Sequence, residues 1–218
     1  DLNIQNSLVF TYSHHQIIED HENQGTLYNP RRRQTGLASG QIWGYQALGL
    51  FKDEEEIKNW AFQDAATKPG DIKYKDINGD GKIDSEDIVR IGRSMIPEIM
   101  WGYNLRAEWK GFDLGLFFQG TWNSNYYLGS ADRGVRRPFA DGKARVEHYN
   151  SWTTDNPNPN APFPRLRSSN FSKNYEASDF WVINSSYIKL KSVDLGYTVK
   201  PQWSEKLGMS KLRVYANF

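Results

Sequence analysis

The clearest pattern in the chain is a two-residue alternation of apolar and polar side chains over residues 99–122. One face of residues 99–109 carries Trp101, Tyr103, Leu105, Ala107 and Trp109, and the other carries Met100, Gly102, Asn104, Arg106 and Glu108. After Lys110 and Gly111, the apolar face continues with Phe112, Leu114, Leu116 and Phe118. A strict period of two around a short glycine turn predicts a β-hairpin. Its strands of about ten residues have the length that crosses a bilayer in a tilted barrel, whereas strands of globular proteins usually have about five or six.

Three further segments alternate in the same way, at residues 8–14, 187–199 and 211–218. In the second of them, Ile188 and Leu190 are out of phase with Val193, Leu195, Tyr197 and Val199, which predicts a β-bulge or a change of environment near Ser192. The clearest helix prediction lies within residues 53–64, because acidic residues occupy its first turn and suit the helix dipole.

Residues 123–178 form a segment rich in Asn, Asp, Pro, Ser and Arg that is too long for an ordinary hairpin loop. One tight turn, one very long loop and long strands edged with aromatic residues are typical of an outer-membrane barrel. We therefore expect an all-β fold that is part of a large antiparallel transmembrane β-barrel, with long extracellular loops and one short helix.

Residues 76–87, with the sequence DINGDGKIDSED, match the spacing of an EF-hand calcium loop. The predicted ligands are the side chains of Asp76, Asn78, Asp80, Asp84 and Asp87 and the carbonyl of Lys82, with Gly81 at the sharp turn. Aspartate replaces the usual glutamate at the last position, and its shorter reach favours a site of modest affinity in a calcium-rich extracellular setting.

The flanks of this loop indicate a structural role for the calcium. A strand-like segment precedes the loop, about two turns of helix are predicted within residues 85–92 and end at Gly92, and no second copy of the loop occurs in the sequence. We therefore treat residues 71–92 as a calcium-loop excursion in which Ca²⁺ stabilises a long loop. The alternative is an acidic, solvated turn built on Asn-Gly and Asp-Gly steps.

Composition restricts the function classes further. The 218 residues carry a net charge of +1, which argues against a nucleic-acid partner, and the absence of cysteine excludes disulfides and thiol chemistry. The chain is polar, with a mean hydropathy of −0.73, yet 14% of its residues are aromatic. A barrel with a wet interior or a carbohydrate-binding β protein fits that combination. No catalytic motif is present, and neighbouring His14, His15 and His21 are more often solvated than metal-bound, so we do not expect an enzyme.

Three segments in this order carry a resemblance to a known family: GYQALGLFKDEEEIKNW, then KPGDIKYKDINGDGKIDSEDIVRIGRSMIPEIMWGYNLRAEWKGFDLGLFFQGTW, then SSYIKLKSVDLGYTV. Together they resemble the C-terminal barrel region of SusC/RagA-type TonB-linked outer-membrane receptors. The resemblance implies TonB-dependent uptake of glycans or oligopeptides across the outer membrane of Bacteroidetes, together with a SusD-like surface lipoprotein. It implies that residues 1–218 are the C-terminal portion of a receptor whose plug domain and first barrel half are absent here, and that the calcium loop is extracellular.

The long loop supplies the candidates for contact with the substrate or the lipoprotein. Aromatic faces stack on sugars or peptide side chains, and arginine binds carboxylates bidentately. The candidates are Trp122, Tyr126, Tyr127, Arg133, Arg136, Arg137 and Trp152. The alternative is that the aromatic residues only surround the barrel and anchor its loops. For the whole chain, the alternative is a secreted, soluble, calcium-stabilised β module that binds carbohydrate through its aromatic residues.

Overall fold

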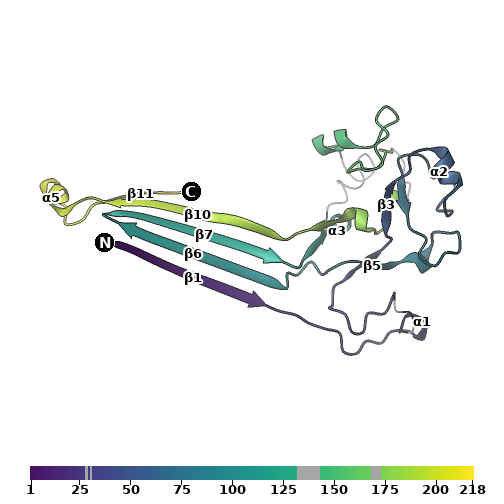
Figure 1. Cartoon of the computed structure of the whole chain (residues 1–218), viewed down its shortest axis with the longest axis horizontal. Helices are drawn as coiled ribbons and strands as arrows, with labels where there is room; N and C mark the ends of the chain where they lie inside the picture. Colours follow the sequence, from purple (N-terminus) through teal and green to yellow (C-terminus); the bar gives the residue numbers. More distant parts are fainter. Residues whose placement is uncertain (28, 30, 132–142, 168–172) are drawn as a thin grey trace. The chain divides into compact units, whose positions relative to one another are not determined.

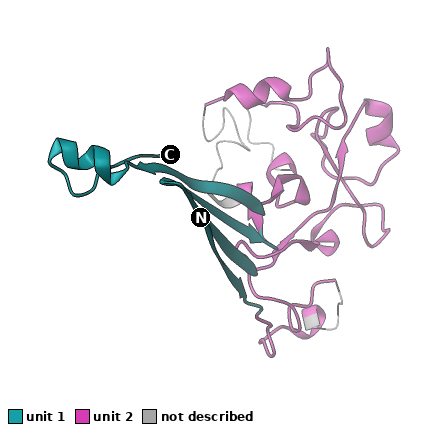
Figure 2. Ribbon diagram, turned by 60° about the vertical axis from the view of Figure 1, so that its left-hand side comes forward, with its two compact units in different colours: residues 1–14, 96–124, 185–218 teal, residues 15–95, 125–184 magenta. Residues whose placement is uncertain are grey.

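The computed structural model describes residues 1–27, 29, 31–131, 143–167 and 173–218. These residues form two compact units (Figure 2). Residues 1–14, 96–124 and 185–218 make up the sheet unit, and residues 15–95 and 125–184 make up the loop unit. No helix among the described residues is long and apolar enough to span a membrane.

The sheet unit is built on five antiparallel strands in the order β1-β6-β7-β10-β11 (Figure 1). Their bounds are β1 Leu2–Tyr12, β6 Ile99–Trp109, β7 Phe112–Trp122, β10 Tyr187–Thr198 and β11 Arg213–Asn217. The predicted hairpin is confirmed, since β6 and β7 pair over their whole lengths and turn at Lys110 and Gly111. Both turn residues have positive φ, at 49° and 92°, as the two-residue turns of twisted hairpins require.

The predicted bulge in β10 is also confirmed. The pairing of β10 with β7 shifts register between Leu190 and Ser192. One extra residue in β10 therefore brings Ile188 and Leu190 onto the same face as Val193 and Leu195, although their sequence phases differ.

The sheet unit departs from the sequence prediction at its first strand and at its last. The strand expected at residues 8–14 extends over Leu2–Tyr12, because every residue of β1 has a partner on β6. Its first half is polar at Asn3, Gln5 and Asn6, which hid the alternation. Before β11, the short helical turns α5 Pro201–Ser204 and η5 Glu205–Leu207 precede the strand, which starts at Arg213.

The loop unit consists of short elements. Its strand pairs are β2 Ile42–Gly44 with β5 Val89–Gly92, β3 Ala47–Leu50 with β4 Ile72–Tyr74, and β8 Asn125–Tyr127 with β9 Val182–Asn184. Its helical turns are α1 Gln24–Leu27, α2 Glu54–Lys58, α3 Leu128–Ala131, η1 Ser85–Asp87, η2 Val146–Asn150, η3 Lys173–Tyr175 and η4 Asp179–Trp181.

Both helix predictions in this unit were too long. The helix within residues 53–64 is only α2, which Asp53 caps through a 2.8 Å hydrogen bond from the Glu56 N–H. It ends early because Phe62 pairs instead with the backbone of Gly81 and Ile83. The helix predicted after the acidic loop is the single turn η1 followed by strand β5, because the backbone there pairs with β2.

A small aromatic core holds the loop unit together. Its fully buried members include Phe51, Ile72, Tyr74 and Trp181. Complete burial stabilises a large apolar side chain by about 1.5 to 3 kcal/mol, so a few such residues are significant for a unit with so little regular structure. The Tyr74 hydroxyl donates to the Lys173 carbonyl at 2.6 Å, and burial raises the pKa of Tyr74.

Candidate functional site

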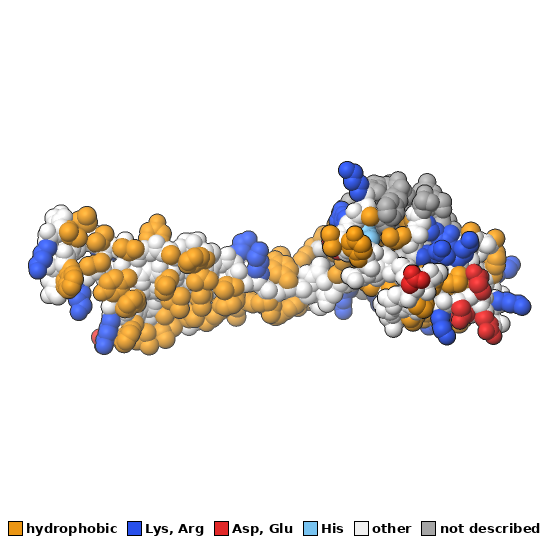
Figure 3. Space-filling view, turned by 90° about the horizontal axis from the view of Figure 1, so that it is seen from above, with side chains coloured by type: hydrophobic (Ala, Val, Ile, Leu, Met, Phe, Trp, Pro, Cys, Tyr) orange, Lys and Arg blue, Asp and Glu red, His pale blue; other side chains and the backbone are white. Residues whose placement is uncertain are grey.

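One face of the five-stranded sheet is almost entirely apolar. The pairing registers place on it Leu2, Ile4, Asn6, Leu8, Phe10 and Tyr12 of β1; Ile99, Trp101, Tyr103, Leu105, Ala107 and Trp109 of β6; Phe112, Leu114, Leu116, Phe118, Gly120 and Trp122 of β7; Ile188, Leu190, Val193, Leu195 and Tyr197 of β10; and Val214 and Ala216 of β11. We call this set the apolar face. Many of its side chains are exposed, among them Phe10 at 58% and Leu195 at 53%, and Figure 3 shows apolar side chains gathered along the sheet unit. A surface of this kind needs an apolar partner.

Aromatic residues lie at both ends of the apolar face. Trp101 and Trp122 are in contact at one end, with ring centroids 5.6 Å apart, and Phe112 contacts Tyr197 at the other, with centroids 4.6 Å apart. Ten residue steps separate Phe112 from Trp122, or about 34 Å at about 3.4 Å per residue. At a strand tilt of about 40° this is about 26 Å, close to the apolar band of about 25 Å between the aromatic girdles of membrane barrels.

The opposite face of the sheet, which we call the polar face, carries the ion pairs. Arg213 of β11 makes two hydrogen bonds, of 3.0 and 2.5 Å, to the carboxylate of Asp113 on β7. This pair crosses the intervening strand β10 at Gly196, where an added Cβ would lie 2.6 Å from atoms of both partners. The glycine in β10 therefore makes room for an ion pair that joins three strands.

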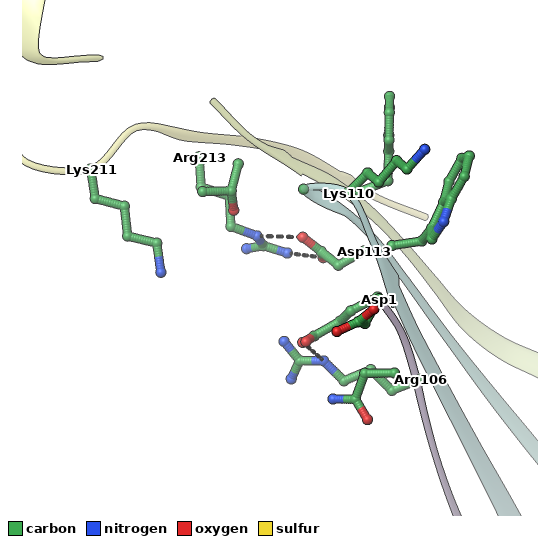
Figure 4. A pocket seen from close by; sticks show the side chains of 12 residues that line it. Asp1, Arg106, Lys110, Asp113, Lys211 and Arg213 are labelled. Atoms are coloured by element: carbon green, nitrogen blue, oxygen red, sulfur yellow. Dashed lines mark hydrogen bonds and ion pairs between the residues drawn. The ribbon is translucent and has the colours of Figure 1, made fainter. Parts of the chain in front are cut away.

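A charged pocket of about 360 Å³ surrounds this ion pair at the end of the sheet with the Lys110 turn (Figure 4). A second ion pair lies in it, between Arg106 and Glu108 at 3.1 Å. Its labelled lining residues are Asp1, Arg106, Lys110, Asp113, Lys211 and Arg213. Nearly all of its charged lining lies on the polar face or in the adjoining turns, so the two faces of the sheet differ sharply in chemistry.

The acidic loop at residues 76–87 lies in the loop unit, and hydrogen bonds from its own backbone order it. Asp76 accepts from the N–H groups of Gly79 at 2.6 Å and Gly81 at 2.8 Å, and these two glycines have positive φ of 78° and 82°. The side chains of Asn78, Asp80 and Asp84 each accept from the N–H two residues further on. The chain therefore turns sharply where the calcium motif requires its turn.

Asp87, the last residue of the motif, is fully buried and joins the two ends of the loop. One of its oxygens accepts from the Ile77 N–H at 2.7 Å and the other from the Asp84 N–H at 3.0 Å. Ile83, also buried, donates its N–H to the Phe62 carbonyl at 2.9 Å. Asp87 thus closes the loop on itself, and the Ile83 side chain attaches the loop to the core of the loop unit.

Among the described residues, no group of three or more Asp, Glu, His or Cys side chains is arranged to hold a metal ion. Of the three histidines considered from the sequence, His14 bonds to Glu98 through Nδ1 at 2.8 Å. Calcium binding by residues 76–87 stays a prediction.

The sequence did not indicate a buried polar network centred on Asp71. Its carboxylate forms an ion pair with Arg167, accepts from the Asn174 amide at 2.8 Å and from the Lys68 N–H at 2.7 Å. Burial raises the pKa of Asp71, although these hydrogen bonds oppose the shift. The network connects segments about 100 residues apart in sequence, so no local pattern reveals it.

The structure places the predicted contact residues in different surroundings. Trp122 lies on the apolar face, and Tyr126 and Tyr127 lie in strand β8, with Tyr127 packed against the core of the loop unit. Trp152 is itself part of that core, only 5% exposed, with its ring where a Cβ on Gly70 would be. This burial favours an anchoring role for Trp152. The remaining candidates, Arg133, Arg136 and Arg137, lie outside the described residues.

The chain has relatives among curated proteins. It is 28% identical over 185 residues to TonB-dependent receptor P3 of Formosa agariphila, a match that covers 84% of this chain and 17% of the relative. TonB-dependent receptor P26 of the same organism is 30% identical over 178 residues, covering 78% of this chain and 16% of that protein. The resemblance to TonB-dependent receptors is confirmed. The chain spans about a sixth of the length of these receptors. No protein-family model matches the chain.

Solved structures share the fold of this chain. The RagAB peptide transporter matches 99% of this chain with a TM-score of 0.66 at 19% identity, and the match covers 22% of that chain. The RagAB peptide importer in the 'open-open' state matches the whole chain with a TM-score of 0.63 at 20% identity. At this identity the likeness concerns the fold alone.

Proposed function

We propose that this chain is part of an outer-membrane import receptor and that its sheet unit supplies five neighbouring strands of a transmembrane β-barrel. The observation that carries the proposal is the apolar face with aromatic residues at both ends, separated by about the height of a bilayer's apolar band. Among the described residues, β1 pairs only with β6 and β11 pairs only with β10. Long strands with open edges need further strands beside them, and closing a barrel supplies these.

In this arrangement the apolar face contacts lipid and the polar face lines the barrel interior. The ion pairs and the charged pocket support this orientation, because charged side chains in a barrel are tolerated on the inner face. The Lys110 turn lies at one end of the sheet. The two segments of the loop unit, residues 15–95 and 125–184, leave the sheet at its other end, after β1 and after β7. Short turns of such barrels are periplasmic and long loops are extracellular, so the loop unit is extracellular.

The partners follow from the receptor family. Import in this proposal is driven through TonB, is assisted by a SusD-like surface lipoprotein, and takes up glycans or oligopeptides in a bacterium of the Bacteroidetes. The support is the similarity to TonB-dependent receptors and the fold shared with the RagAB peptide importer. Transport of this kind requires binding and conformational change but no catalytic group on this chain.

We also propose that residues 76–87 bind one structural calcium ion. Support comes from the all-oxygen donor set, which suits this hard cation, and from the turn at Gly81. Asp76, Asn78, Asp80, Asp84 and Asp87 would hold it, together with the Lys82 carbonyl.

Deletion and complementation in the source bacterium test the transport function. The gene for the complete receptor is deleted, growth is measured on single glycan and peptide sources, and the receptor is located by membrane fractionation. The proposal expects a growth defect on particular nutrients, recovery on complementation, and receptor in the outer-membrane fraction. A protein found only in the culture medium would support the alternative, a secreted carbohydrate-binding module.

A further inference from the structure

Residues 199–212 join β10 to β11, and we call them the β10–β11 turn. They make a connection much longer than the about two to five residues of an ordinary hairpin loop, and they contain the helical turns α5 and η5. The β10–β11 turn lies at the same end of the sheet as the Lys110 turn, because the Thr198 N–H donates to the Gly111 carbonyl at 2.7 Å (Figure 1). A long, folded connection at this end of the sheet calls for a physical explanation.

The main chain of the β10–β11 turn is closed by its own hydrogen bonds. Gly208 ends η5 with a positive φ of 70° and donates its N–H to the Glu205 carbonyl at 2.9 Å. The Met209 N–H donates to the Ser204 carbonyl at 3.0 Å, which completes a Schellman motif. Ser204 is fully buried. The turn therefore presents its side chains in a defined arrangement.

Two large apolar side chains of this turn are exposed on one side. Trp203 is 65% exposed and Leu207 is 64% exposed, and residues four apart in a helical turn lie on the same side. Glu205, the only acidic residue of the turn, is two residues from each of them and so faces another direction. Met209, 45% exposed, follows the glycine of the Schellman motif, where an apolar residue commonly packs back on the helical turn. The turn is therefore amphipathic.

The two ends of the turn continue the apolar face of the sheet. The Val199 N–H donates to the Leu212 carbonyl at 2.9 Å, which extends the pairing of β10 and β11 by one step. Val199 is two residues beyond Tyr197, and Leu212 is two residues before Val214, so both lie on the side of the apolar face.

The position of the turn matches the headgroup layer of a bilayer. Val199 lies about 5 Å beyond the aromatic end at Tyr197, measured along the membrane normal at about 3.4 Å per residue and a tilt of about 40°. The polar layer on each side of a bilayer's hydrocarbon core is about 5 to 7 Å thick. The β10–β11 turn thus begins where lipid headgroups lie next to the apolar band.

The charge of the turn selects among lipids. It carries three lysines, Lys200, Lys206 and Lys211, against the single glutamate. Lys200 and Lys206 are exposed, and no ion pair among the described residues includes either of them. Tryptophan and leucine on one side, with lysine beside them, are typical of segments that lie in a membrane interface and attract anionic lipids.

We infer that the β10–β11 turn binds anionic phospholipids of the periplasmic leaflet. Trp203 and Leu207 lie at the boundary with the acyl chains, and the ammonium groups of Lys200 and Lys206 lie at the phosphates. This inference rests on the proposed function, because it takes the apolar face to contact lipid. Lipid suits the exposed side of the turn better than a protein segment does, since that side continues a face that already contacts acyl chains.

The test uses the complete receptor in vesicles of equal parts phosphatidylglycerol and phosphatidylcholine. One of the two lipids carries a photoreactive diazirine on an acyl chain, and mass spectrometry locates the cross-linked peptides. Residues 199–212 should cross-link at least fivefold more to phosphatidylglycerol than to phosphatidylcholine. Changing Lys200→Gln and Lys206→Gln together should abolish this preference. The matched control is Glu205→Gln in the same helical turn, which should retain it.

Trp203→Ala, a change at an exposed position, should lower cross-linking of the turn to both lipids at least threefold. Equal cross-linking to the two lipids, a preference that survives the lysine changes, or a turn that cross-links to neither lipid because another receptor segment covers it would overturn the inference. Cross-links in β6 and β7 distinguish this from failure of the proposed function. If both lipids label the apolar face of these strands, only the inference fails, whereas strands labelled by neither lipid would refute the barrel itself.

Discussion

Placing a charge at Leu116 tests whether the apolar face contacts lipid. Leu116 lies between Leu105 of β6 and Val193 of β10 on that face. It is four residues from Phe112 and six from Trp122, so at about 3.4 Å per residue and a tilt of about 40° it lies about 10 Å from one aromatic end and about 16 Å from the other. This depth is near the middle of the apolar band. Leu116→Arg should therefore cost about 2 to 4 kcal/mol, roughly a 30- to 1,000-fold change in the folding equilibrium.

The measurement is denaturant unfolding of the complete receptor in lipid vesicles, followed by tryptophan fluorescence. The matched control is Gln119→Arg, three residues away on the same strand but on the polar face, opposite Lys189. Like-charge repulsion there should cost at most about 1 kcal/mol, because water and neighbouring polar groups solvate the new charge. Equal losses of stability in the two variants would refute the assignment of the two faces, and a larger loss in Gln119→Arg would reverse it.

Three further changes test particular contacts in the complete receptor. Gly196→Val should displace the ion pair that crosses β10 and lower the free energy of unfolding by about 1 to 3 kcal/mol, measured by denaturant titration. An unchanged unfolding midpoint would contradict the close approach of this ion pair to the backbone of Gly196. Trp152→Ala removes a buried ring from the core of the loop unit and should lower its free energy of unfolding by about 3 to 5 kcal/mol. The loop unit should therefore be cleaved faster in limited proteolysis, and wild-type resistance would show that the ring does not pack there. Asp80→Ala should abolish saturable calcium binding in a calorimetric titration, whereas Lys82→Ala should preserve it because the predicted ligand is a backbone carbonyl; an unaltered titration of Asp80→Ala would remove the proposed calcium site.

The hairpin of β6 and β7 was predictable from the sequence because strand periodicity is local. Residues 99–122 alternate strictly, and only a two-residue turn interrupts them, so pattern alone determined both strands, their register and the chemistry of each face. The bulge at Ser192 was predictable for the same reason, since a change of phase within one strand requires an extra residue if one face is to stay apolar. The receptor resemblance was readable from the order of these segments as well.

Other features depended on partners far away in the sequence. The polar residues at the start of β1 form a strand only because β6 pairs with them, and residues 89–92 become a strand instead of a helix because β2 lies beside them. The Asp71 network brings together residues about 100 positions apart, and the burial of Trp152 depends on the close approach of Gly70. Local sequence thus determined where the chain alternates and turns, whereas only the tertiary structure decided which distant groups desolvate one another, because burial and pairing arise between segments that no short window contains.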